Sequence, residues 1–262
     1  MAIRRFHKSQ RTLASLVAGG SLTDEAADFL TACVAAHKNI LVSGGTGTGK
    51  TTLLGALSAA FDDAERILVI EDVKELDIAK PHILYLEAQR PDRFGQGGIS
   101  VRELFRGALR MRPDRIIVGE CRGGEALDMI QAMTSGHTGS LSTLHANDPR
   151  AALQRLETMA LMSDIDLPLG PLRAQIVSAI DLVVQIARQH GHRIVTEISE
   201  IDGLDDGGRF VVRPLYRLRQ RDDDGRHLMW TGHRPRFADE VTLVYPDRVA
   251  GPSRSVWAAP EL

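Results

Sequence analysis

Short apolar runs alternate with segments of helical periodicity along the first two thirds of the chain. The runs of strand length are residues 39–43, 66–72, 82–88, 115–119 and 140–146. The segments with apolar residues at helical spacing are residues 51–61, about 100–112, about 124–134 and about 148–162. Strands that alternate with helices in this way form a parallel sheet covered by helices. The pattern therefore predicts an α/β fold with a doubly wound, mainly parallel sheet.

The periodicity changes after residue 181. Residues 181–189 and 192–202 predict a hairpin that turns at His190 and Gly191, and residues 209–218 predict one more strand. We interpret these strands as a C-terminal antiparallel appendage to the sheet. The resulting division is a linker and lead-in helix (1–38), a core (39–202), a β appendage (203–237) and a tail expected to be mobile (238–262).

Composition narrows the class of protein only a little. The 262 residues are 43% hydrophobic and 25% charged, which is ordinary for a soluble globular protein. The formal net charge of −2 and the few aromatic residues give little material for a nucleic-acid groove, so no nucleic-acid partner is expected. Two distant cysteines, the lack of an apolar run of about 18 residues and the lack of a secretory signal indicate a cytoplasmic location.

The stretch "ILVSGGTGTGKTTLL" (residues 40–54) places a glycine-rich loop between a predicted strand and a predicted helix. It matches the pattern G-x-x-x-x-G-K-[ST], in which loop N–H groups and the helix N-terminus cradle a phosphate. The predicted nucleotide-binding residues are Gly44, Gly45, Thr46, Gly47, Thr48, Gly49, Lys50, Thr51 and Thr52. Lys50 is expected to reach the β- and γ-phosphates of ATP, and the hydroxyl of Thr51 is expected to ligate Mg²⁺.

Acidic residues end two of the predicted strands. Glu71 and Asp72 follow "ILVI", and Glu120 follows "IIVG". Ligands bind at the carboxyl ends of the strands in a doubly wound sheet. A nucleotide hydrolase needs carboxylates there, both beside the metal and for the attacking water. We therefore expect at least one of these glutamates to be catalytic.

Histidines and arginines supply the remaining candidates. His145 ends a strand on the side where the phosphate is expected, so a γ-phosphate contact or a water relay is a reasonable role. His137 lies eight residues earlier, and this spacing without a third ligand argues only weakly for a metal. The candidates for an arginine that stabilises the transferred phosphoryl group are Arg90, Arg110, Arg112 and Arg122, acting within the chain or across a subunit boundary.

Four sequence motifs, in this order along the chain, resemble those of the secretion ATPase superfamily of type II and type IV secretion and pilus systems. The motifs are "GGTGTGKTT", "VIEDVKEL", "RMRPDRIIVGECRGGEALDMIQAMTSGHTGSLSTLHAN" and "RLETMALM". The resemblance covers about residues 3–202, "TGHRPRF" (231–237) also fits, and the CpaF-like branch of Flp/Tad pilus assembly is the most similar. It implies a RecA-like P-loop ATPase that uses ATP and Mg²⁺. It also implies a hexameric ring, peripheral to the cytoplasmic side of the inner membrane, that drives platform proteins of a pilus or secretion system.

The resemblance also implies roles for single residues. Glu71, in the Asp box, corresponds to the residue that activates water. Glu120 ends the atypical Walker B motif and corresponds to the residue that holds the Mg²⁺ shell through water. The His box runs from His137 to His145, and His145 is its nucleotide-sensing member.

Arginines of the segment before the Walker B motif fall on Arg110 and Arg112, and Arg122 follows the Walker B glutamate. Family members carry an N-terminal domain that folds over the nucleotide, whereas "IRRF" (residues 3–6) corresponds to the linker after that domain. The sequence is thus expected to be a fragment or a naturally short paralogue, with slow hydrolysis and weak self-association.

Two other functions remain open from the sequence alone. The first is a nucleic-acid translocase on the same fold, which salt-dependent binding of single-stranded DNA would indicate. The second is a non-catalytic module that binds ATP and regulates a partner. Turnover by the purified chain separates this second function from that of a motor.

Overall fold

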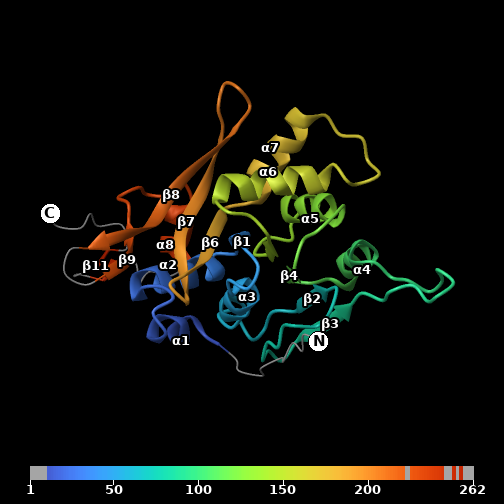
Figure 1. Cartoon of the computed structure of the whole chain (residues 1–262), viewed down its shortest axis with the longest axis horizontal. Coiled ribbons are helices and arrows are strands. Elements are labelled where there is room, and N and C mark those ends of the chain that lie inside the picture. Colours follow the sequence, from blue (N-terminus) through green and yellow to red (C-terminus); the bar gives the residue numbers. More distant parts are fainter. Residues whose placement is uncertain (1–10, 222–224, 245–249, 252–253, 256–262) are drawn as a thin grey trace.

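The computed structural model describes residues 11–221, 225–244, 250–251 and 254–255. Its centre is a nine-stranded sheet with the strand order β3-β2-β4-β5-β1-β6-β7-β8-β9, shown in Figure 1. The strands on one side of it are parallel: β1 (Ile40–Gly44), β2 (Ile67–Glu71), β3 (Ile83–Glu87), β4 (Arg115–Val118), β5 (Leu141–Leu144) and β6 (Leu182–Gln189). The prediction of a doubly wound, mainly parallel sheet is confirmed.

Helices cover both faces of the parallel strands. One face carries α1 (Leu13–Ala18), α2 (Asp24–Ala35) and α3 (Lys50–Ser58). The other face carries α4 (Val101–Ala108), α5 (Glu125–Thr134), α6 (Pro149–Ala160) and α7 (Leu169–Ala179), with the short 3₁₀ helix η1 (Leu109–Met111) after α4. Three of these helices begin after a typical N-cap residue. The side chains of Thr23, Ser100 and Asp148 accept a hydrogen bond from a backbone N–H group in the first turn of α2, α4 and α6, respectively.

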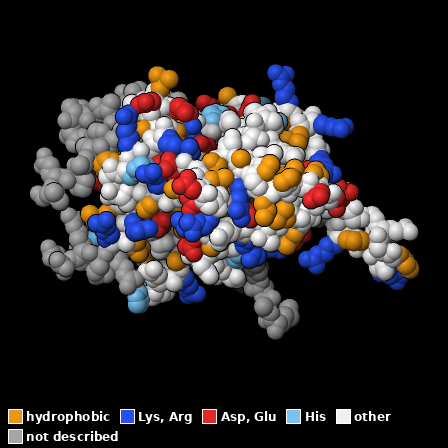
Figure 2. Space-filling model, turned by 90° about the horizontal axis from the view of Figure 1, so that it is seen from above, with side chains coloured by type: hydrophobic (Ala, Val, Ile, Leu, Met, Phe, Trp, Pro, Cys, Tyr) orange, Lys and Arg blue, Asp and Glu red, His pale blue; other side chains and the backbone are white. Residues whose placement is uncertain are grey.

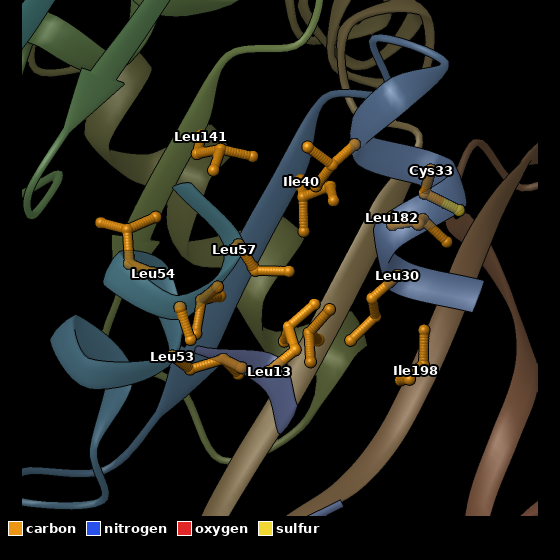
Figure 3. Close-up of a cluster of buried hydrophobic side chains, with 14 of the residues drawn as sticks. Leu13, Leu30, Cys33, Ile40, Leu53, Leu54, Leu57, Leu141, Leu182 and Ile198 are labelled. Carbon is orange, nitrogen blue, oxygen red and sulfur yellow. The ribbon is translucent and has the colours of Figure 1, made fainter. Parts of the chain in front are cut away.

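The alternation of side chains along each strand divides the core in two. Ile40 and Val42 of β1 point into one hydrophobic cluster, and Leu41, between them, points into the other. Figure 3 shows the first cluster, where Leu53 and Leu57 of α3 pack beside the strands. Because both faces of β1 are buried, its residues are apolar apart from Ser43, as is usual in parallel strands.

The C-terminal strands continue the same sheet in antiparallel order. These strands are β7 (His192–Leu204), β8 (Phe210–Arg221) and β9 (Gly225–Trp230). The predicted hairpin at His190 and Gly191 is present between β6 and β7. The antiparallel pairing therefore begins within the segment expected to be core, before residue 203, and β9 is a further strand that the pattern did not indicate.

The predicted mobile tail begins with a helix in the structure. This helix, α8 (Ala238–Val244), packs against α2 and buries Val241. The short strands β10 (Ala250–Gly251) and β11 (Arg254–Ser255) form a separate pair, and the rest of the tail lies outside the described residues, as does the "IRRF" segment.

Exposed apolar side chains gather near the connection between α6 and α7. Figure 2 shows orange side chains grouped on part of the upper face of the molecule, where α5, α6 and α7 lie. The exposed members near this connection are Leu161, Met162, Ile165 and Leu169. Contiguous apolar surface of this kind is typical of a contact with another protein. No helix within the described ranges is long and apolar enough to cross a bilayer.

Candidate functional site

The glycine-rich loop joins the carboxyl end of β1 to the first residue of α3. Gly49 has a φ of +100°, in the left-handed region that favours glycine, and α3 begins at the next residue, Lys50. The Lys50 ammonium donates to the carbonyl oxygen of Gly45 at 3.0 Å and lies 3.2 Å from Nδ1 of His145. Burial lowers the pKa of Lys50, while the nearby Glu120 carboxylate opposes that shift. The loop thus ends at a buried cation and a helix N-terminus, and both favour the binding of a phosphate group.

Glu71 is the last residue of β2, and its carboxylate is held by backbone donors. Its Oε1 accepts from the N–H groups of Glu75 at 3.1 Å and Leu76 at 3.2 Å. Burial raises the pKa of Glu71 to about 7, although these two N–H groups oppose the shift. A Cβ on Gly119 would lie 2.7 Å from Cγ of Glu71, so a glycine is required beside this side chain. A fixed carboxyl group with a pKa near neutrality is suited to general base catalysis.

Glu120 and His145 form a polar pair beside the loop. Nε2 of His145 lies 2.8 Å from one carboxylate oxygen of Glu120, and Arg122 donates to the other at 2.7 Å. Burial opposes ionisation of Glu120, but Arg122, His145 and Lys50 together lower its pKa. Burial and the Lys50 cation lower the pKa of His145. His145 is therefore neutral near pH 7, with Nε2–H toward Glu120 and Nδ1 toward the Lys50 ammonium.

Glu75 joins the site although the sequence analysis did not select it. Its Oε2 accepts from the hydroxyl of Thr51 at 3.4 Å. The sequence feature that indicates Glu75 as a site residue is its position, four residues after Glu71 in the same acidic motif. A threonine hydroxyl beside a carboxylate is a donor set that suits Mg²⁺, which takes one or two carboxylates together with phosphate oxygens. Thr51 and Glu75 fit that ion, and Glu120 lies near Lys50 on the same side.

The structure separates the other candidates from this site. Arg110 and Arg112 are exposed and precede β4, so they lie at the amino edge of the sheet, opposite the loop. His137 precedes β5 and lies at that same edge. Arg90 follows β3 in an exposed connection on the loop side. Arg122 is thus the arginine of this group that contacts Glu120, whereas Arg110 and Arg112 are remote from the phosphate loop of their own chain.

The sheet topology explains why the other residues meet. Strands β2, β4, β5 and β1 are neighbours and run parallel, so the residues after their carboxyl ends share one edge. That edge carries a phosphate loop, a fixed carboxyl group and a glutamate–histidine pair. Fold and site together define a nucleotide-binding domain of the RecA-like P-loop class.

Comparison with known proteins identifies the family. The family described as "Type II/IV secretion system protein" matches residues 1–214, and the chain belongs to this family. The type IV secretion system protein PtlH of Bordetella pertussis is 47% identical over 184 residues, covering 68% of this chain and 54% of PtlH. The chain spans about half the length of the curated relatives it matches.

Solved structures agree with this result. The VirB11 ATPase of the Brucella suis type IV secretion system is 31% identical, with a TM-score of 0.61 over 74% of this chain and 57% of VirB11. The ATPase DotB of Legionella pneumophila is 20% identical and has a TM-score of 0.53 over 79% of this chain and 50% of DotB, which supports the fold alone. Membership of the family was predicted from the sequence and is confirmed.

Proposed function

We propose that this chain is the ATP-hydrolysing motor domain of a protein secretion or pilus assembly system. The observation that carries the proposal is the meeting of the phosphate loop, Glu71, Glu120 and His145 at one edge of the sheet. The family and the relatives PtlH and VirB11 support the same function. The CpaF-like branch of Flp/Tad pilus assembly remains our prediction within this family.

The proposed chemistry assigns a distinct task to each group. The loop N–H groups and Lys50 bind the phosphates of ATP, and Thr51 and Glu75 hold Mg²⁺, which supplies positive charge against the phosphate oxygens. Glu71 takes a proton from the attacking water, and its ionised fraction grows as the pH rises through about 7. We therefore expect kcat/KM to increase over that range.

Glu120 and His145 connect the chemistry to the state of the nucleotide. Nδ1 of His145 faces the Lys50 ammonium, so a phosphate that attracts Lys50 also removes a partner from the imidazole. Because Nε2 faces Glu120, the imidazole links the phosphate-binding lysine to the carboxylate that supports the metal shell. This arrangement suits His145 for sensing the nucleotide and for holding Glu120 in position.

We further propose that the protein works as a homo-oligomer, most simply the hexameric ring expected for the family. Arg110 and Arg112 lie at the edge opposite the phosphate loop, so contact with a γ-phosphate requires a neighbouring subunit. The apolar surface at the α6–α7 connection supports contacts with other proteins. The proposed partners are platform proteins at the cytoplasmic side of the inner membrane.

The test is turnover by the purified chain and by variants of the two glutamates. Glu71→Gln keeps the shape of the side chain but removes the base, so kcat should fall by about 10²- to 10⁴-fold while ATP affinity stays similar. Asp206→Asn, in the exposed β7–β8 turn, is the control and should turn over normally. Normal turnover by Glu71→Gln with an inactive Glu120→Gln would reverse the two roles. ATP binding without hydrolysis by the unaltered chain would instead indicate a non-catalytic regulatory module.

A further inference from the structure

The β6–β7 hairpin extends past the strand that leads into the phosphate loop. Strand β6 pairs in parallel with β1, and the last pair of their register is Gly44 with Ile186. The chain beyond Ile186 therefore continues beside the loop, turns at His190 and Gly191, and returns as β7. Arg193 is the second residue of β7, so the topology places it against the loop.

Arg193 makes two direct contacts with the loop. Its Nε donates to the carbonyl oxygen of Gly47 at 3.3 Å. Its Cδ lies only 2.9 Å from the position that a Cβ on Gly49 would occupy. Arg193 therefore packs against the turn that presents the loop N–H groups, while Lys50 donates to Gly45 within the same loop.

Among the described residues, no carboxylate neutralises the charge of Arg193. In the described part of the chain no acidic oxygen lies within ion-pair distance of its guanidinium, and neither Nη group makes a hydrogen bond. Arg122 and Arg173 differ from Arg193, because Arg122 pairs with Glu120 and Arg173 pairs with Glu157. An exposed guanidinium with two uncommitted NH₂ groups at the rim of a phosphate loop is suited to bidentate recognition of a phosphate.

We propose that Arg193 is a phosphate-binding residue that the β6–β7 hairpin supplies to the nucleotide of its own chain. This inference rests on the proposed function, because it assumes that the loop binds a nucleoside triphosphate. Arg193 contacts the phosphates through its Nη groups, and its Nε holds the hairpin against Gly47. Nucleotide binding is thereby linked to the position of the antiparallel strands.

The test compares binding of Mg·ATP and of inorganic tripolyphosphate, which lacks base and ribose. Arg193→Gln should weaken both by about tenfold, since a charge-assisted hydrogen bond to phosphate is lost. Arg193→Lys keeps the charge but loses the bidentate guanidinium, so it should recover only part of the affinity for both ligands. Arg219→Gln, the same change at an exposed arginine of β8, is the matched control and should bind both ligands normally.

Three results would overturn the inference and leave the proposed function intact. The first is unchanged affinity of Arg193→Gln for both ligands. The second is weaker binding of ATP with unchanged binding of tripolyphosphate, which would place Arg193 on the base or ribose. The third is a loss of affinity that Lys does not restore and that accompanies a lower melting temperature without ligand, which would indicate a purely structural role. Failure of the unaltered chain to bind either ligand would refute the proposed function, and this inference with it.

Discussion

Two buried cations at opposite edges of the sheet, Arg115 and Lys50, have very different surroundings. Arg115, at the amino edge, donates to Glu65 at 2.7 Å, to the carbonyl oxygen of Val34 at 2.9 Å and to that of Gly139 at 3.3 Å. Its guanidinium also lies 4.4 Å from the ring centroid of Phe61. Lys50, at the carboxyl edge, has a loop carbonyl and a neutral imidazole as its partners.

The difference separates a structural charge from one available to a ligand. Burial of a charge is costly unless a partner compensates for it, and Glu65 compensates for Arg115 within the fold. No carboxylate in the described ranges forms an ion pair with Lys50, so its charge remains available to an anion. Burial alone therefore does not identify the functional cation, whereas the absence of an anionic partner does.

The largest expected effect concerns the exposed arginines of the amino edge. Arg110→Ala or Arg112→Ala should lower turnover by about 10³-fold if that arginine acts as a finger across a subunit boundary. ATP affinity of the single subunit should not change, because both residues are remote from its own loop. Mixing the variant with Lys50→Ala should restore part of the activity, since each subunit completes the other's site. Steady-state ATPase assays of the mixture measure this.

Two results would show that neither arginine acts in trans. One is full turnover by both single variants. The other is an inactive variant that stays inactive at every mixing ratio although it associates with Lys50→Ala in sedimentation. Either result would leave the amino edge with a structural role alone.

The next effect tests the structural role of Arg115. Arg115→Ala should lower the free energy of unfolding by about 3 kcal/mol, because it leaves Glu65 without its buried partner. ATP affinity of the folded protein should be preserved. Urea denaturation and calorimetry measure the two quantities. Arg213→Ala, which removes a half-exposed pair with Asp202, is the control and should cost less than about 1 kcal/mol. An Arg115→Ala protein of normal stability but poor affinity would contradict the comparison.

The last effect is a pH dependence of stability that arises from Glu71. Its pKa in the folded protein is about 7, raised from 4.5, so the folded state holds this proton more tightly than the unfolded chain. The associated stability is present below pH 4.5 and is lost as the pH rises to about 7. Glu71→Gln lacks this loss, so its melting temperature relative to the unaltered protein should rise across that interval and then level off. A pH-independent difference in melting temperature would argue against the raised pKa.

Local patterns were sufficient to predict the parallel strands and the residues at their carboxyl ends. Buried parallel strands are mainly apolar, so the acidic residues Glu71 and Glu120 mark where two of them end. The glycine-rich loop requires specific residue types at fixed spacing, which made Lys50 and Thr51 predictable. The order of the strands in the sheet could not be predicted from local patterns, because the neighbours of each strand depend on how the connections cross the sheet.

The contacts that the sequence did not indicate join residues far apart in the chain. Arg193 reaches Gly47 because β6 lies beside β1, and Arg115 finds Glu65 and Gly139 because three segments meet at the amino edge. Glu75 was close to the motif but was not selected, because its contact with Thr51 depends on the turn after β2. The helix α8 was missed because the composition of the tail gave no sign of the surface of α2 on which it packs.

Strand β6 pairs in parallel with β1 on one side and antiparallel with β7 on the other. Backbone hydrogen bonds therefore connect β1, which leads into the phosphate loop, to the C-terminal strands without an intervening flexible linker. A pull along the C-terminal strands loads the β1–β6 hydrogen bonds in shear, so they share the force instead of breaking one after another. In mechanical terms, β6 is a stiff coupling through which a displacement at the phosphate loop can be transmitted to the far side of the sheet.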